Sequence, residues 1–164
     1  MADRRAGLLA VAVVLALAGC TNDTSDNGQP TGGTAHVSPA PVRTDREPIA
    51  KRFPHLGDFA EVHWQASTAG TDNSRVPGPT DTRIEAIVAL RPDALVAAVK
   101  QYDWSPAPAG WDEPLSAELR PFLPTDGTWQ VSEQYTDDVR TASYSGLVYL
   151  DTTSGTVYLR LIDS

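Results

Sequence analysis

The segment from Tyr144 to Ile162, YSGLVYLDTTSGTVYLRLI, decides the fold class of the chain. It holds two alternating runs, Tyr144 to Leu150 and Thr156 to Ile162, and a period of two is typical of β-strands with one buried face. The connection between them ends in Gly155, a residue that adopts a positive φ in a tight turn without steric cost. The segment therefore predicts an antiparallel hairpin that turns at Asp151 to Gly155.

Three more strands are expected earlier in the chain. Residues 59 to 66 and residues 82 to 90 each alternate apolar and polar side chains, and a third run extends from Trp129 to Tyr135. Glycine and proline in residues 68 to 80 mark a loop between the first two strands. The side chains that we expect to point inward from those two strands are Val62, Trp64, Ala66, Ile84, Ala86, Val88 and Leu90.

One main helix is predicted after the second strand. Pro92 suits the first turn of a helix, and Leu95, Val99 and Tyr102 follow at a spacing that places them on one side. The stretch from Glu113 or Pro114 to Leu119 is at most a short second helix. The element order ββα(α)βββ predicts an α+β fold, in which an antiparallel sheet of about five strands carries one main helix on one face.

The N-terminus has the composition of an export signal. The positively charged start contains Arg4 and Arg5, and Ala6 to Leu17 is an uninterrupted apolar run. A spanning helix needs about 20 apolar residues, whereas the core of a secretory signal needs about 7 to 15, so the run predicts a cleaved signal peptide. The arginine pair leaves both the general secretory route and the twin-arginine route open.

The apolar run ends in Leu17-Ala18-Gly19-Cys20, which resembles the lipobox of bacterial lipoproteins. The resemblance implies cleavage between Gly19 and Cys20 and attachment of a diacylglycerol, with acyl chains such as palmitate, to the Cys20 thiol. Two acyl chains on one residue make a durable anchor. We therefore expect a lipid-anchored protein on the outer face of the cytoplasmic membrane; the alternative is a buried cysteine in an ordinary apolar helix.

The amino-acid composition divides the chain into three segments. Residues 21 to 52 are rich in small polar side chains and proline, and they cannot bury enough apolar surface to offset the entropy of ordering. All twelve Phe, Trp and Tyr residues lie between Phe53 and Tyr158. We therefore predict a signal peptide at residues 1–19, the lipidated cysteine and a disordered tether at 20–52, and one α+β domain at 53–164.

The domain itself resembles small actinobacterial lipoproteins whose activity is uncharacterised. The likeness rests on Tyr144 to Tyr158, on Trp104 and Trp111, and on Leu119 to Pro124. It implies that residues 53 to 164 fold as a unit, and it brings no site.

The charge of the domain and the motifs of the sequence limit the classes of function that we consider. Residues 53 to 164 hold sixteen acidic and seven basic side chains, and such a domain is poorly suited to nucleic acid, whose phosphates need clustered Lys and Arg. The sequence has no nucleophile elbow, phosphate-binding loop or paired metal-binding cysteines, and its three histidines are scattered. We therefore assign no catalytic residue, no metal site and no cofactor.

Two surfaces are candidates for binding. If the helix covers one face of the sheet, with Trp129 and Val131 among the buried residues, the opposite face is open to solvent. That face offers one apolar ring and several hydrogen-bonding groups as a binding platform, the alternative being an ordinary solvated surface. Its candidate residues are His63, Arg83, Glu85, Tyr158 and Arg160.

The loop between Trp104 and Trp111 is the second candidate, because two Trp side chains beside a proline-rich loop can clasp a sugar ring or a peptide. Packing at the edge of the core is the alternative. We expect a non-catalytic binding module that engages an envelope protein, peptide or polymer. The alternative function is an envelope enzyme or enzyme inhibitor in which acidic groups such as Glu61 and Glu85 do acid–base work.

Overall fold

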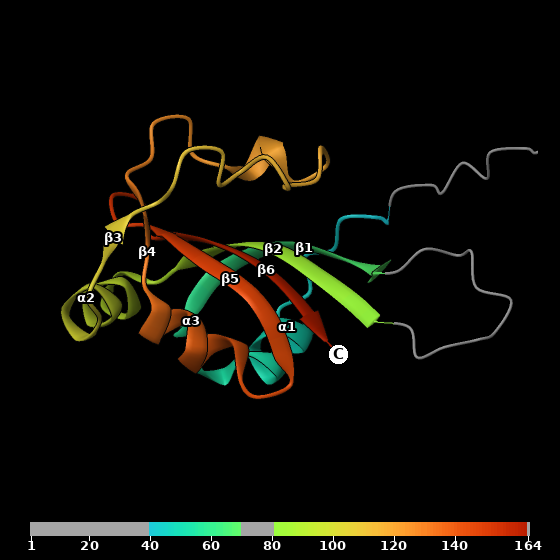
Figure 1. The fold of residues 1–164 in the computed structure, drawn as a ribbon, viewed down its shortest axis with the longest axis horizontal. Helices are drawn as coiled ribbons and strands as arrows, with labels where there is room; N and C mark the ends of the chain where they lie inside the picture. Colours follow the sequence, from blue (N-terminus) through green and yellow to red (C-terminus); the bar gives the residue numbers. More distant parts are fainter. Residues whose placement is uncertain (1–39, 70–80, 164) are drawn as a thin grey trace, which may run out of the picture. The chain divides into compact units, whose positions relative to one another are not determined.

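The computed structural model describes residues 40–69 and 81–163 (Figure 1). The predicted signal peptide, the lipobox, most of the tether and most of the loop at residues 68 to 80 lie outside these residues. Within them, no helix is long and apolar enough to cross a membrane.

A six-stranded antiparallel sheet in the order β1-β2-β6-β5-β4-β3 forms the centre of the described region (Figure 1). The predicted α+β class is therefore confirmed, and the short strand β3 is the one that the sequence pattern did not indicate. The strands are β1 (Phe59–Ala69), β2 (Asp81–Leu90), β3 (Ser105–Pro106), β4 (Trp129–Val131), β5 (Tyr144–Asp151) and β6 (Thr156–Asp163).

Three helices lie on one side of this sheet (Figure 1). They are α1 (Glu47–Arg52), α2 (Pro92–Gln101) and α3 (Glu133–Arg140), with a 3-10 turn, η1, at Pro54–Leu56. Their apolar side chains bury the inner face of the central strands, including the predicted inward residues Ile84, Ala86, Val88 and Leu90. Ala66 was expected there too, but its side chain is exposed.

Helix α3 replaces the second half of a predicted strand. The strand expected at Trp129 to Tyr135 ends at Val131, because the Ser132 hydroxyl accepts a hydrogen bond from the Tyr135 amide (3.4 Å) and begins a helix. Tyr135 and Val139, four residues apart, then point into the core. The strand prediction for residues 133 to 135 was wrong because a period of two over so few residues did not reveal the helix.

Helix α2 lies where it was predicted, but a different side of the helix faces the core. Leu95 and Tyr102 pack against the sheet as expected, together with Ala98. Val99 is 43% exposed, so its assignment to the buried stripe was wrong. The stretch from Pro114 to Leu119 forms turns, and a 3-10 turn, η2 (Arg120–Phe122), follows it.

Residues before the predicted boundary at Phe53 pack with the domain. The backbone of Arg43 exchanges two hydrogen bonds with that of Trp64 (2.7 and 2.9 Å), and the Arg43 guanidinium lies 4.3 Å from the centre of the Trp64 ring. Ile49 of α1 is fully buried in the core. We expected no domain contact from residues 20 to 52, and residues 43 to 52 correct that expectation, because one apolar side chain in a polar segment is enough to dock a short helix.

The predicted hairpin is confirmed. Strands β5 and β6 pair from Tyr144 to Asp151, and Gly155 has a φ of +76° while its amide donates to the Asp151 carbonyl (2.9 Å). The Asp151 carboxylate accepts hydrogen bonds from the Thr128 amide (2.7 Å) and the Ser154 hydroxyl (2.6 Å). Burial opposes its ionisation, but these donors outweigh burial and hold the pKa of Asp151 below its ordinary value.

Candidate functional site

The sheet face opposite the helices is covered, not open. The segment Ala107–Leu123, called here the cover segment, runs across it (Figure 1). Leu115 and Leu119 of this segment pack with Ile87, Tyr149 and Tyr158 of the sheet and form a second core. The prediction of a solvated face was therefore wrong, because β2, β5 and β6 present apolar side chains on both faces.

Trp129 and Val131 lie on the opposite face of the sheet from the one that we predicted. Both were assigned to the helix-side core, and both pack against the second core under the cover segment. The Trp129 ring lies 4.4 Å from that of Trp111, so it supports the cover segment.

A buried polar cluster lies beside this second core. Its centre is Glu85, which is 4% exposed and forms an ion pair with Arg160 Nε (3.1 Å). The hydroxyl of Ser116 and the amide of Gln65 donate to the other carboxylate oxygen, Oε2. Glu85 was a candidate binding residue, but its carboxylate is fully engaged within the protein and joins the cover segment to the sheet.

His63 of β1 and Arg83 of β2 lie on the same face, with His63 level with Ile87 and Arg83 four residues before Ile87. The His63 ring stacks on Phe122 of the cover segment, with centroids 3.6 Å apart. Four buried side-chain atoms on this face have no hydrogen-bond partner within the structure described here, and each retains hydrogen-bonding capacity. They are His63 Nδ1, Gln65 Oε1, Arg83 Nε and the Tyr158 hydroxyl.

An aromatic hollow opens where the cover segment meets β5 and β6. The rings of Trp111, Tyr149 and Tyr158 form its wall, with Trp111 5.2 Å from Tyr149 and 5.9 Å from Tyr158. Its volume is about 110 Å³. We call it the aromatic pocket, and it is lined by Trp111, Pro114, Gly146, Leu147, Tyr149, Tyr158 and Arg160.

The electrostatics of the aromatic pocket suit a neutral group with one hydrogen-bond acceptor. Burial raises the pKa of Tyr149, and burial together with the nearby Glu85 carboxylate raises that of Tyr158, so both phenols stay neutral in the physiological range. Arg160 uses its Nε toward Glu85, and no hydrogen bond among the described residues uses its two terminal nitrogens. An acceptor at the rim can therefore receive a hydrogen bond from Arg160.

The structure brings the two predicted candidate surfaces partly together. Tyr158 and Arg160 from the sheet face and Trp111 from the loop line one pocket. Trp104 lies in the helix-side core instead, where its ring is 5.2 Å from Tyr135 and its Nε1 donates to the Ala98 carbonyl (3.2 Å). The two Trp side chains occupy opposite faces of the sheet, so they do not form a clasp.

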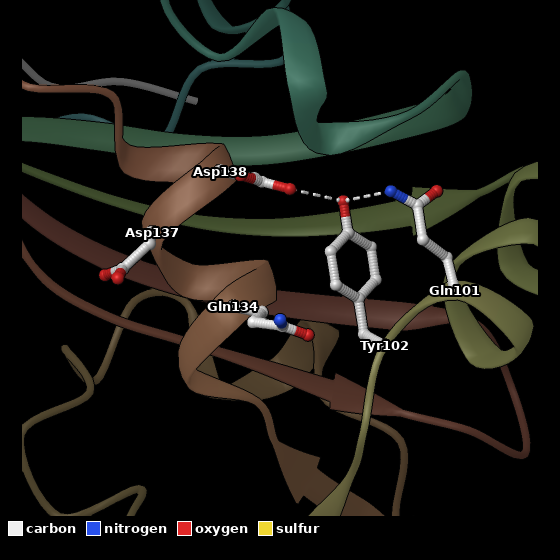
Figure 2. A pocket seen from close by; sticks show the side chains of 5 residues that line it. All are labelled: Gln101, Tyr102, Gln134, Asp137 and Asp138. Carbon is white, nitrogen blue, oxygen red and sulfur yellow. Dashed lines mark hydrogen bonds between the residues drawn. The ribbon is translucent and has the colours of Figure 1, made fainter.

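A second hollow, of about 380 Å³, lies between α2 and α3 on the helix side (Figure 2). The Tyr102 hydroxyl donates to Asp138 (2.9 Å) and accepts from Gln101 (3.1 Å), while Asp137 points away from them (Figure 2). Burial and the contact with Asp138 raise the pKa of Tyr102. Gln101, Tyr102 and Asp138 therefore form one hydrogen-bonded chain, and no cluster of three metal-ligating side chains occurs among the described residues.

The two acidic residues considered for an enzyme have different surroundings, since Glu61 is exposed and Glu85 is buried in the polar cluster. Glu85 pairs across the sheet with Gln65, which lies four residues after Glu61 on β1. At about 3.3 Å per residue, the two carboxyl-bearing positions are about 13 Å apart along the strand.

Comparison with known proteins adds no assignment, because no protein-family model, curated protein or solved structure matches the chain.

Sequence reasoning missed four residues of the aromatic pocket. Pro114 was placed in a possible helix, and Gly146, Leu147 and Tyr149 were treated only as parts of a strand. The available signal was that β5 has apolar side chains at both even and odd positions over Leu147 to Leu150, which is typical of a strand covered on both faces.

Proposed function

We propose that this protein is a lipid-anchored, extracytoplasmic lipoprotein whose domain is a non-catalytic interaction module, and that it takes one apolar side chain of an envelope protein or peptide into the aromatic pocket. The lipobox-like Leu17-Ala18-Gly19-Cys20 supports the anchor. The wall of three aromatic rings, with Arg160 at the rim, supports the binding role.

The size of the pocket favours a side chain over a whole small molecule. Sites for drug-sized ligands span about 300 to 1,000 Å³, and an engineered apolar cavity of about 150 Å³ holds benzene. A hollow of about 110 Å³ fits one aliphatic side chain. Interfaces in which one side chain fills an aromatic-lined pocket are typical of protein–protein recognition, where a few anchors carry most of the binding energy.

Arg160 supplies the directional part of the recognition. Its guanidinium is held by Glu85 at the rim of the pocket, so its donors are oriented before a partner arrives. A peptide carbonyl next to the inserted side chain is an acceptor of the right kind. Apolar burial then gives affinity, and the hydrogen bond selects a peptide over a simple hydrocarbon.

A pair of matched variants tests the pocket. Leu147 is 50% exposed at the rim, and Val96, an apolar residue of α2 away from the pocket, is 65% exposed, so both positions accept Glu without loss of the core. The purified full chain is titrated with N-acetyl-leucinamide, with N-acetylglycinamide as the probe that lacks a side chain, and followed by NMR. We expect leucinamide to shift the Trp111 indole and the Gly146 and Leu147 amides.

We expect Leu147→Glu to weaken leucinamide binding about tenfold, which corresponds to ~1.4 kcal/mol, and Val96→Glu to leave it unchanged. Equal weakening in both variants, or equal shifts with the glycinamide probe, contradicts a side-chain pocket at this place.

A further inference from the structure

The cover segment is attached to the sheet at two neighbouring points. At its start, the Ala107 amide donates to the Trp129 carbonyl (3.0 Å). Beyond its end, the Thr128 amide donates to the Asp151 carboxylate (2.7 Å). Because Thr128 and Trp129 are consecutive, the two attachments lie side by side, next to β3 and β4 (Figure 1). A segment with adjacent ends can move away from the sheet without breaking a strand pair.

Between these points the cover segment contacts the sheet through side chains. In the part of the chain that the structure describes, the backbone hydrogen bonds of residues 108 to 127 stay within that stretch, as between the Leu119 amide and the Ser116 carbonyl (3.1 Å). The hydrogen bonds to the sheet come from one side chain, because the Ser116 hydroxyl donates to Glu85 and accepts from Gln65. Movement of the segment therefore breaks no backbone hydrogen bond to the sheet.

The covered face of the sheet holds buried polar atoms that have no protein partner among the described residues. An unsatisfied buried polar atom costs free energy, and water satisfies it once the face is exposed. On the helix side, by contrast, the buried Tyr135 hydroxyl donates to the Leu56 carbonyl (2.9 Å). The polar atoms therefore lower the cost of uncovering this face of the sheet. They are His63 Nδ1, Gln65 Oε1, Arg83 Nε and the Tyr158 hydroxyl.

The helix-side core does not depend on the cover segment. Its buried side chains come from the helices, from η1 and from the inner face of the strands, and none of them belongs to residues 107 to 123. The fully buried side chains that the cover segment contributes are Leu115 and Leu119, both in the second core. Opening exposes these leucines and leaves the larger core intact, so it costs less free energy than global unfolding.

We propose that the cover segment acts as a flap, which opens as one unit about its two adjacent ends and uncovers this face of the sheet. Gly110 and Gly127 lie near the two ends, and small residues of this kind often absorb the backbone rotation of a hinge.

The aromatic pocket exists in the closed state. Trp111 and Pro114 of the cover segment form one side of it, and residues of β5 and β6 form the other. A ligand that contacts both sides binds the closed state better and shifts the population towards it. The opening itself goes beyond the proposed function, and the effect of a ligand on the opening rests on that function.

Hydrogen exchange of the purified full chain in low concentrations of urea, followed by NMR, tests the opening. Short turns that have left the sheet do not stay folded in water, so their amides exchange from the open state. We expect the amides of Leu115, Leu119 and Phe122 to be at least tenfold less protected than those of β6. They should also share one dependence on urea, because a unit exposes the same surface whichever amide reports it.

A pair of matched variants tests the link through Ser116. Ser116→Ala removes the hydrogen bonds that join the cover segment to the sheet, and it should lower the protection of the cover-segment amides about tenfold while β6 is unchanged. Ser145→Ala, the same change at an exposed serine of β5, should leave both sets of amides unchanged. N-acetyl-leucinamide at ten times its Kd should raise the protection of the cover-segment amides about tenfold.

Other outcomes overturn the proposal in distinguishable ways. If the cover-segment amides exchange with the protection and urea dependence of β6, the segment opens only in global unfolding and is not a flap. If they exchange with unrelated urea dependences, the segment frays in parts and does not open as a unit. If unit opening is observed and leucinamide does not shift the Trp111 indole, the flap stands and the proposed function is wrong. If leucinamide shifts that indole and leaves the exchange unchanged, the coupling of the pocket to closure is wrong.

Discussion

Leu119→Ala tests whether the cover segment is part of the folded domain. Leu119 is 0% exposed and packs in the second core with Ile87 and Tyr158. Truncation of a buried leucine costs about 2 to 5 kcal/mol, as lost transfer energy plus the cavity that remains. A loop segment relaxes into the cavity more readily than a helix does, so we expect a loss of about 3 kcal/mol.

The same loss appears as a lower melting temperature. For a domain of this size 1 kcal/mol corresponds to about 4 °C, so Leu119→Ala should melt about 12 °C lower. Urea denaturation of the full chain, followed by tryptophan fluorescence, should give a lower midpoint with an unchanged slope. Val96→Ala is the control, because Val96 is 65% exposed and surface changes stay within about 0.5 kcal/mol.

If Leu119→Ala changes the free energy of unfolding by less than about 0.5 kcal/mol, the cover segment does not pack on the sheet in solution. The aromatic pocket, which this segment helps to line, is then not formed. A separate early transition in the variant, seen by NMR at the Trp111 indole but not by circular dichroism, would show instead that the cover segment unfolds on its own.

The remaining predictions concern the turn and the buried ion pair. Gly155→Val should cost about 1 to 3 kcal/mol in a thermal melt, because φ is +76° and the new Cβ lies 3.2 Å from Leu95 Cδ2; an unchanged melt removes the special role of glycine. Asp151→Asn should destabilise at neutral pH. Because the pKa of Asp151 is lowered in the folded protein, the wild type should be more stable than the variant by its full margin above pH 3.8, the ordinary pKa. This difference in the free energy of unfolding should shrink as pH falls through the folded pKa. A difference that stays constant down to about pH 2 contradicts this. Glu85→Ala should cost about 1 to 3 kcal/mol in urea because it removes the acceptor of Ser116 and Gln65, and adding Arg160→Leu should change this little, since the Arg160 side chain is 32% exposed.

The sequence was informative wherever a long pattern had one explanation. The hairpin at Asp151 to Gly155 followed from two alternating runs and a glycine, and the structure has it at those residues. Strand β2 and the start of α2 at Pro92 are likewise as predicted. In these elements local preference and tertiary packing agree.

The candidate site was only half predictable, because it depends on a segment without regular structure. Tyr158 and Arg160 were identified from their side of the strand, and Trp111 from its residue type. Leu115 and Leu119 are four residues apart, which fits the short helix predicted there, but this spacing does not indicate that they pack against the sheet. Loop packing is set by side chains far apart in the chain, and a pattern search along the sequence does not detect it.

Short elements account for the other errors. The helix α3 begins after three residues of strand, and α1 docks through the single buried side chain of Ile49. Runs this short carry too few positions for one period to be distinguished from another.

Membrane fractionation of a Cys20→Ser chain tests most directly the proposal that the domain works from a lipid anchor. A hydroxyl does not replace the thiol in thioether formation, so we expect the variant to leave the membrane fraction and to incorporate no labelled fatty acid, while its domain retains the cooperative melt of the wild type. Variant protein that still pellets with membranes after its signal peptide has been cleaved, or that still incorporates labelled fatty acid, contradicts an anchor on Cys20.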